Sequence, residues 1–409
     1  MKLLLIGMAD SIHVVKWINQ INQEGWNIHL FPSIDICSVH PDMSGVTVHH
    51  SFYWARDNRK KANLNFRGIP LPFYGLVLSF KGLLNRYIPN YRAAKLGRLI
   101  KKLKPDIIHS IEIQHAGYLT LEAMKVYQQK LPPWIVTNYG SDIYLFGRLP
   151  EHKQKISEVL TTCDFYSCEC KRDVELAKKM GFSGKILPVF PNSGGLDLKT
   201  ISRFKQNGKT SDRRNITIKG YQGWAGRALV GLRALERCAD ILSGYEINII
   251  LLAPPEVIIA AALFQESTGI TVNIIPEKSP HYDILKIHGS SRISIGLSIS
   301  DAISTSLLEA MAMGSFPIQS WTACADEWIV DGETGFLVHP NDPETVEKAI
   351  RKALTDDELV NQAAIINNKV IEERLDVLIL KNKAIEFYKE VAKEKLRYLP
   401  PTNNCSRFG

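Results

Sequence analysis

The chain has 409 residues, of which 45% are hydrophobic and 22% charged, and its net charge is +8. This length exceeds what one hydrophobic core usually serves, so two domains of about 200 residues each are predicted. No apolar run of about 18 residues or more occurs, which argues against a membrane span, and the apolar run at the start is too short for a signal peptide. The seven cysteines are an odd number without zinc-ligand spacing, and they fit a reducing cytoplasm.

The first elements form a βαβ unit. Residues 2–7 are a short apolar run that ends in glycine and predicts a strand, and residues 26–31 predict a second strand. Between them, Ser11 can cap a helix whose apolar residues recur on one face.

A basic amphipathic helix is predicted over residues 91–104. Residues 81–104 hold eight Lys or Arg and no acid, and within 91–104 four apolar residues lie opposite four basic ones at helical spacing. The pattern fits a surface helix with a solvated basic face. It also fits a peripheral contact with an anionic membrane or an anionic acceptor.

The alternation of strands and helices continues along the chain. Strands are predicted at 105–110, 134–138 and 164–168, with helices near 116–130 and 151–161. A polar stretch at 193–215 predicts the linker between domains. A second alternating series starts at residue 215, so the fold class predicted is α/β, with two doubly wound parallel sheets in tandem.

Some nucleotide-binding classes are disfavoured. No G-x-G-x-x-G follows the first strand, which argues against a dinucleotide cofactor, and no G-x-x-x-x-G-K-[ST] occurs. The positive charge lacks interleaved aromatic and basic residues, so no nucleic-acid partner is predicted. In doubly wound sheets, ligands bind beyond the carboxyl ends of the strands.

One such strand end carries a cluster of polar residues. Asp301 lies in a loop after an apolar strand, and Ser304, Thr305 and Ser306 precede the helical run that contains Glu309. Unpaired backbone N–H groups at a helix start attract phosphate. The alternative is purely structural, since Ser306 and Glu309 also match a capping box and Gly314 can end the helix.

This region resembles the retaining glycosyltransferases of family 4, which have the GT-B fold of two Rossmann-like domains facing across a cleft. The resemblance rests on "DAISTSLLEAMAMGSFPIQS" (301–320) followed by "DEWIVDGETGFLVHPNDPETVEKAI" (326–350). It extends more weakly to "SIHVVKWINQINQEGWNIHLF" (11–31) and "TNYGSDIY" (137–144). The resemblance implies an acceptor-side domain at 1–195, joined by a C-terminal helix at about 376–409, and a donor-binding domain at 196–375.

The resemblance also implies roles for individual residues. Asp301 would contact the transferred sugar, and Arg227, after Gly226, would neutralise the leaving diphosphate. The donor-binding set implied is Glu309, which would hold the ribose, with Ser304, Thr305, Ser306, Gly226 and Leu308. Arginine suits the diphosphate because its planar fork donates two hydrogen bonds. Candidates for the acceptor side of the cleft are His13, His109, Tyr139 and Asp142, although a lone histidine is commonly structural.

Three positions depart from the family pattern. The first motif acid is usually Glu and here is Asp301, which is one methylene shorter. The lysine that follows the Gly–Arg pair is replaced by Val230, and Lys219 or Arg233 could take its place. The usual histidine of the donor-facing loop is Tyr139.

The function predicted is transfer of a sugar, with retention, from a nucleoside diphosphate sugar to an acceptor hydroxyl of a glycan, lipid-linked or small-molecule acceptor. We expect a UDP-sugar as the donor, and neither a cofactor nor a metal. The location predicted is the cytoplasm, with peripheral contact at the inner face of the membrane as an option. The alternatives are a GT-B sugar-nucleotide epimerase or phosphorylase, and a non-catalytic sugar-nucleotide-binding protein.

Overall fold

The computed structural model describes residues 1–34, 38–55, 64–71, 74–88, 90–127 and 132–397. The chain divides into two compact units, Met1–Gly194 with Leu380–Gly409, and Gly195–Ile379. Within the described ranges, no helix combines the length and the apolarity that crossing a membrane requires.

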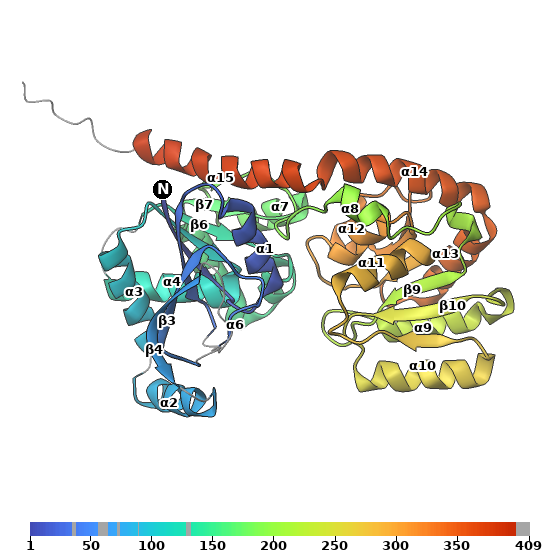
Figure 1. Cartoon of the computed structure of the whole chain (residues 1–409), viewed down its shortest axis with the longest axis horizontal. Coiled ribbons are helices and arrows are strands. Elements are labelled where there is room, and N and C mark those ends of the chain that lie inside the picture. Colours follow the sequence, from blue (N-terminus) through green and yellow to red (C-terminus); the bar gives the residue numbers. More distant parts are fainter. Residues whose placement is uncertain (35–37, 56–63, 72–73, 89, 128–131, 398–409) are drawn as a thin grey trace, which may run out of the picture. The chain divides into compact units, whose positions relative to one another are not determined.

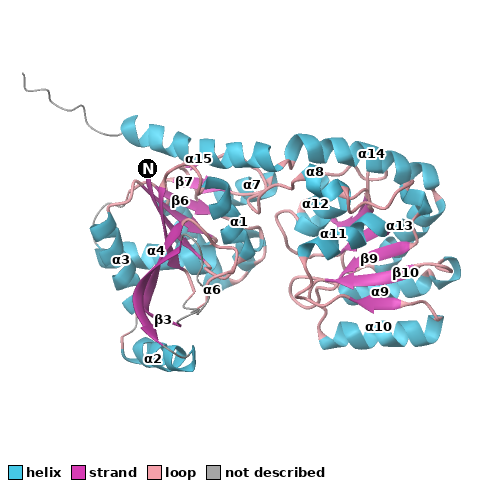
Figure 2. Cartoon of the chain, viewed as in Figure 1, coloured by secondary structure: helices cyan, strands magenta, loops and turns pink. Residues whose placement is uncertain are grey.

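The first unit is built on an eight-stranded, all-parallel sheet with helices on both faces (Figure 2). Its order is β4-β3-β2-β1-β5-β6-β7-β8. The strands are β1 (Lys2–Gly7), β2 (Asn27–Pro32), β3 (Val46–Ala55), β4 (Leu64–Leu71), β5 (Ile107–Ile111), β6 (Trp134–Thr137), β7 (Phe165–Ser167) and β8 (Lys185–Ile186). The five strands predicted in this unit are confirmed. Central strands that are covered on both faces are almost wholly apolar, so their sequences give a clear signal. Strand β3 and the two edge strands, β4 and β8, were not predicted.

The helices of this unit follow the predicted alternation. They are α1 (Ile12–Ile21), α2 (Tyr74–Tyr87), α3 (Tyr91–Leu103), the π-helical turn Ile113–Gly117, α4 (Tyr118–Tyr127), α5 (Ser141–Tyr144), α6 (Pro150–Thr162), α7 (Lys171–Lys179) and most of α15 (Val377–Arg397). The Ser11 hydroxyl accepts a hydrogen bond from the N–H of His13, which confirms the predicted cap. Parts of two predicted helices, 128–130 and 398–409, lie outside the described residues.

The predicted basic helix is α3, and its apolar side is part of the core. Ala93, Leu96 and Ile100 are at most 2% exposed and pack in the core cluster of the first unit. The exposed side chains of α3 are basic ones, among them Arg98, Lys101 and Lys102. The helix therefore offers solvent a basic face and no apolar one.

A buried hydrogen-bond chain fastens α15 to the first unit, beside which it lies in red in Figure 1. Trp17 Nε1 donates to the Tyr388 hydroxyl oxygen at 2.7 Å, so the Tyr388 proton is available for His109 Nδ1, also at 2.7 Å. His109 Nε2–H is then the donor to Thr137 Oγ1 at 2.6 Å. Burial lowers the pKa of His109 to about 3, which keeps the imidazole neutral, as this chain of donors requires.

The Tyr388→Phe variant is expected to lose about 1–3 kcal/mol of unfolding free energy. The substitution leaves the buried N–H of Trp17 and the buried Nδ1 of His109 without their shared partner, and such groups cost their full desolvation. Urea unfolding of the full chain measures the loss, and hydrogen exchange in α15 locates it. Tyr87→Phe is the control, because Tyr87 is 73% exposed. An equal effect of both substitutions would contradict the role of this chain.

The second unit has a six-stranded parallel sheet in the order β11-β10-β9-β12-β13-β14. Its strands are β9 (Asn215–Lys219), β10 (Glu246–Ile250), β11 (Val272–Ile274), β12 (Ser291–Gly296), β13 (Phe316–Ser320) and β14 (Phe336–Val338). The direction of strand addition reverses between β9 and β12. The carboxyl ends of these two strands therefore form the topological switch point, where doubly wound sheets bind ligands.

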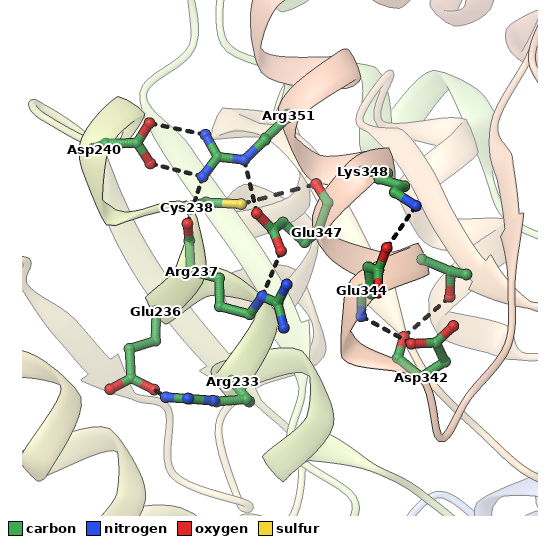
Figure 3. A network of polar contacts seen from close by, with 11 residues as sticks. Arg233, Glu236, Arg237, Cys238, Asp240, Asp342, Glu344, Glu347, Lys348 and Arg351 are labelled. Carbon is green, nitrogen blue, oxygen red and sulfur yellow. Dashed lines mark hydrogen bonds and ion pairs between the residues drawn. The ribbon is translucent and has the colours of Figure 1, made fainter.

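Two groups of helices cover this sheet. They are α9 (Ala228–Arg237), α10 (Pro255–Thr268) and α13 (Pro343–Thr355) in one group, and α11 (His281–Ser290), α12 (Thr305–Ala312) and α14 (Asp357–Arg374) in the other. An ion network joins α9 and the 3₁₀ turn after it to α13 (Figure 3). Arg237 of α9 contacts Glu347 at 2.5 Å, and Arg351 binds Glu347 at 3.0 Å and Asp240 of the turn with two contacts of 2.9 Å. The guanidinium of Arg351 lowers the pKa of the Asp240 and Glu347 carboxyls. The contribution of the network to stability is therefore lost as the pH falls through those lowered pKa values.

The predicted linker at 193–215 is more ordered than the sequence suggested. It contains α8 (Leu198–Ser202) and a 3₁₀ turn at Thr210–Asp212. The turn is held against the second unit, because the Thr210 hydroxyl donates to the carbonyl of Gly314 at 2.7 Å. This segment lacks the apolar periodicity of a packed helix or strand, and hydrogen bonds from its polar residues hold it in place instead.

Candidate functional site

The loops that follow β9 and β12 are fastened to each other at the switch point of the second unit. Gly226 and Ser298 form an isolated bridge, and the N–H of Ile299 donates to the carbonyl of Ala225 at 3.0 Å. A Cβ on Gly226 would overlap the carbonyl of Tyr221, so this approach requires glycine. The predicted residue Gly226 thus has a definite structural role at the site.

Ser298 is further fixed from the neighbouring strand β13. Its carbonyl accepts hydrogen bonds from the hydroxyls of Ser320 and of Thr322, the latter at 2.6 Å. Ser298 is itself 3% exposed. The loop after β12 therefore has a fixed geometry before any ligand arrives, which is the condition for a preorganised site.

Helix α12 begins two residues earlier than the capping-box interpretation requires. Its N-cap residue is Ser304, whose side chain makes no capping hydrogen bond, and Ser306 lies inside the first turn. The Glu309 carboxylate contacts His281. The capping box is therefore wrong, whereas Gly314, with φ of +76°, ends the helix as predicted.

The first turn of α12 presents backbone donors. Leu307 and Leu308 donate to the Ser304 carbonyl at 3.0 and 3.2 Å, and for the described part of the chain no hydrogen bond is recorded from the N–H groups of Thr305 and Ser306. Thr305 and Ser306 are half-buried, whereas the Leu308 side chain is 1% exposed and belongs to the core. Two N–H donors and the positive end of the helix dipole thus meet at one point.

Asp301 lies at this point together with a buried lysine. Lys219, the last residue of β9, places its Nζ 3.5 Å from Asp301 Oδ2, 3.3 Å from Ser298 Oγ and 3.2 Å from Ser304 Oγ. The Lys219 side chain is 8% exposed and that of Asp301 27%. We call Lys219, Ser298, Asp301 and Ser304 the switch-point site.

Glu309 lies on the same helix, one turn further along, and is 5% exposed. Its Oε1 is 2.6 Å from Nε2 of His281, the first residue of α11, which orients the carboxylate. Below it, His288 contacts Ser294 Oγ at 2.9 Å, and burial lowers the pKa of His288 to about 4. The carboxylate of Glu309 thus contacts the exposed His281, whereas the buried, neutral His288 contacts the hydroxyls of Ser294 and Ser306.

Arg227 is the N-cap residue of α9 and lies on the same carboxyl edge of the sheet. Its guanidinium donates to the carbonyls of Gly223 and Gly226, and its Nε donates to Asn341 Oδ1 at 2.5 Å. These contacts fix a planar fork of donors at the loop after β9. The residue is half-buried and is therefore not a simple solvent-exposed helix residue.

Val230, which stands where the family pattern has a lysine, packs against the apolar core of the second unit. The two candidates to replace that lysine, Lys219 and Arg233, have different positions. Arg233 is exposed on α9 and pairs with Glu236. Lys219 alone of the two replacement candidates belongs to the switch-point site.

The first unit has its own switch point, between β1 and β5. Glu112 directly follows β5 with φ of +82°, a strained backbone conformation for this residue. Its carboxylate accepts hydrogen bonds from the N–H groups of His115 and Ala116, and Asp142 Oδ2 accepts from Ile113 at 3.0 Å. Burial, and next the charge of Asp142, raise the pKa of Glu112 to about 8; burial raises that of Asp142 to about 6.

The other candidates of this unit differ in exposure. The rings of His13 and Tyr139 are 5.6 Å apart, and the N–H of Tyr139 points to Asp142 Oδ2 at 3.4 Å. Burial raises the pKa of Tyr139 well above its ordinary value. His109 is 1% exposed and both of its ring nitrogens have protein partners, which favours the structural role over a role in a cleft.

Two protein-family models match the chain. Residues 79–165 match a model described as glycosyl transferase 4-like, and residues 265–370 match glycosyl transferases group 1. The second match contains Asp301, Glu309 and the start of α12. The chain is a GT4-type glycosyltransferase.

Solved structures agree on the fold of this glycosyltransferase. Sucrose-phosphate synthase from Thermosynechococcus elongatus is 15% identical, with a TM-score of 0.67 over 96% of this chain and 100% of that one. Anabaena HepE in complex with UDP and glucose is 15% identical, with a TM-score of 0.62 over 95% and 100%. A trehalose-6-phosphate synthase, an enzyme of glycosyl transfer with retention, is 13% identical, with a TM-score of 0.68 over 96% and 99%. The fold is GT-B. No curated protein sequence is similar enough to count as a relative.

Within this glycosyltransferase, the structure brings Asp301, Ser304 and Gly226 together and adds residues that the sequence did not assign. Ser298 and His281 had no sequence signal, because one contributes a loop hydroxyl and the other meets Glu309 from a separate helix. Glu112 had a signal, since it is an acid directly after a buried strand at a switch point. The side chains of Leu308 and His109 are in the cores of their units.

Proposed function

We propose that this glycosyltransferase moves a hexose from a nucleoside diphosphate sugar, with a UDP-sugar favoured, to an acceptor hydroxyl and retains the anomeric configuration. The observation that carries the proposal is the start of α12, where two backbone donors, the helix dipole and Asp301 converge. That Anabaena HepE has been solved with UDP and glucose supports the choice of donor. Acceptors in glycan, lipopolysaccharide, glycolipid or secondary-metabolite synthesis are all compatible with it.

In the proposed complex, each part of the donor meets a different group. The diphosphate accepts hydrogen bonds from the N–H groups of Thr305 and Ser306, and Arg227 adds the two donors of Nη2, because its Nε and Nη1 already donate to protein oxygens. Glu309 accepts from the ribose hydroxyls, because a carboxylate can accept several hydrogen bonds at once. Asp301 accepts from hydroxyls of the sugar.

The reaction needs no residue as a general base. The bond from the anomeric carbon to the diphosphate oxygen breaks, and the acceptor oxygen forms its bond on the same face of the sugar. The proton of the acceptor hydroxyl passes to the departing diphosphate oxygen. Arg227 and the α12 dipole stabilise the charge that develops on the diphosphate, which is electrostatic catalysis at a preorganised site. We propose that this replaces a metal ion.

The location proposed is the cytoplasm, with an electrostatic contact at an anionic membrane surface as an option. The exposed basic side chains of α3 support an attraction to anionic lipid headgroups. Its apolar side chains lie in the core of the first unit, so insertion of this helix into lipid forms no part of the proposal.

A panel of nucleoside diphosphate sugars tests the function. A true donor at about a hundred times its dissociation constant stabilises the chain by roughly 2.7 kcal/mol, which a thermal-shift assay detects. The donor is then incubated with and without acceptor alcohols, and NMR of the products gives the anomeric configuration. An inverted product, an epimerised or phosphorolysed sugar, or binding without any donor hydrolysis or transfer would each contradict the proposal.

A further inference from the structure

The ammonium of Lys219 is a buried charge at the centre of the switch-point site. It is 8% exposed, and it donates hydrogen bonds to the hydroxyls of Ser298 and Ser304 and forms an ion pair with the carboxylate of Asp301. It also lies 4.7 Å from the centre of the Tyr221 ring. An ammonium has three donors, and the two hydroxyls use two of them. A buried charge loses its hydration and needs close partners. The distance from the ammonium to the Asp301 carboxylate is 3.5 Å, which is longer than its distances to the two hydroxyls.

The same ammonium explains why the first N–H groups of α12 have no side-chain cap. Ser304 is the N-cap residue, and a serine there usually turns its hydroxyl to the N–H of the second or third helical residue. Here the Ser304 hydroxyl accepts from Lys219 at 3.2 Å and caps nothing. The N–H groups of Thr305 and Ser306 therefore stay available to an external acceptor, and a cation is bound to the residue that precedes them.

We infer that Lys219 is the counter-charge of the donor diphosphate, and that Asp301 is the ion-pair partner of its ammonium until the donor binds. The inference rests on the proposed function. When the diphosphate arrives, one of its oxygens takes the place of Asp301 Oδ2 on the ammonium, and the released carboxylate accepts from the sugar hydroxyls. A single exchange thus links the phosphate end of the donor to its sugar end.

The exchange and a purely structural ion pair predict different affinities for UDP, which has the diphosphate but not the sugar that is transferred. If Asp301 competes with the diphosphate for Lys219, removal of its charge strengthens the binding of UDP. A structural ion pair predicts weaker binding or no change in the Asp301→Asn variant, because the partner would only lose support.

The experiment is a double-mutant cycle with UDP as the probe, measured by isothermal titration calorimetry on the full chain. Lys219→Met is expected to weaken UDP binding roughly ten- to hundredfold, the range for a hydrogen bond between charged groups. Asp301→Asn is expected to strengthen it about two- to fivefold, as for a partly exposed ion pair. In the Lys219→Met background, Asp301→Asn is expected to change UDP binding by less than about 1.5-fold, because the competition is gone.

Lys348→Met is the control for loss of a positive charge, because Lys348 is exposed on α13 and pairs with Glu344. Circular dichroism and thermal unfolding show whether Lys219→Met is folded; if it is not, the single Asp301→Asn variant still decides by the sign of its effect. Normal UDP binding by folded Lys219→Met, or unchanged or weaker UDP binding by Asp301→Asn, would overturn the inference and leave the proposed function standing. A wild-type chain that binds none of UDP, GDP and ADP would overturn both.

Discussion

The Asp301→Asn variant is expected to transfer sugar roughly 10²- to 10³-fold more slowly than the wild-type chain, with nucleotide binding no weaker. Glycosyl transfer develops positive charge on the sugar ring, and a carboxylate beside the ring stabilises that charge only in the transition state. Asparagine keeps the size of the side chain and its hydrogen-bonding oxygen but not the charge. The loss should therefore fall on kcat rather than on the dissociation constant of UDP.

The measurement is steady-state transfer at saturating donor, together with UDP titration of both proteins. Asp283→Asn is a suitable control, since Asp283 lies on α11 of the same unit and pairs with Lys286 on the exposed side. Its rate should equal that of the wild-type chain. Transfer by Asp301→Asn at the wild-type rate would show that Asp301 does not contact the sugar.

The central strands and the presence of a helix after the loop at 301–304 could be predicted from the sequence because each has a local signal. Residues 3–6 and 134–136 are apolar throughout, as is typical of strands buried on both faces, and the polar step at 301–306 separates a strand from a helix. Strand β3, "VTVHHSFYWA", carries two adjacent histidines and lies near an edge of its sheet. Its burial depends on neighbours that no local pattern reveals.

The capping box shows the limit of a local signal at the site. Ser306 and Glu309 have the right spacing, but the helix begins at Thr305 with Ser304 as its N-cap. That choice depends on Lys219, which lies 85 residues earlier in the chain and takes the Ser304 hydroxyl. The contact between His281 and Glu309 is likewise set by how α11 and α12 pack.

A more general signal follows from Lys219 and Glu112. Each is an ionisable residue at the carboxyl end of an apolar strand that borders a switch point, one as the last residue of β9 and one as the first after β5. A buried charge there must find partners or ligands, whereas the same residue at the amino end can reach solvent. The sequence "NITIK" carried this signal for the donor side.

Replacement of Arg227 by alanine is expected to lower kcat/KM for transfer by about 10²-fold, the cost of removing one preorganised donor from a developing anion. The fork of Arg227 is already held by backbone carbonyls and Asn341, so the diphosphate would meet an oriented guanidinium rather than a mobile one. Arg227→Lys should recover only part of the rate, because an ammonium is a point charge without the paired donors.

Two variants separate this role from support of the loop after β9. Arg233→Ala removes the same type of side chain from the exposed side of the same helix, where it pairs with Glu236, and should leave transfer unchanged. Asn341→Ala removes the side-chain partner of Arg227 but leaves the guanidinium, so a purely positional role predicts a loss as large as that of Arg227→Ala. If the guanidinium itself meets the leaving diphosphate, Asn341→Ala should cost less than about tenfold, because most of the binding free energy of a charged donor stays with the charge.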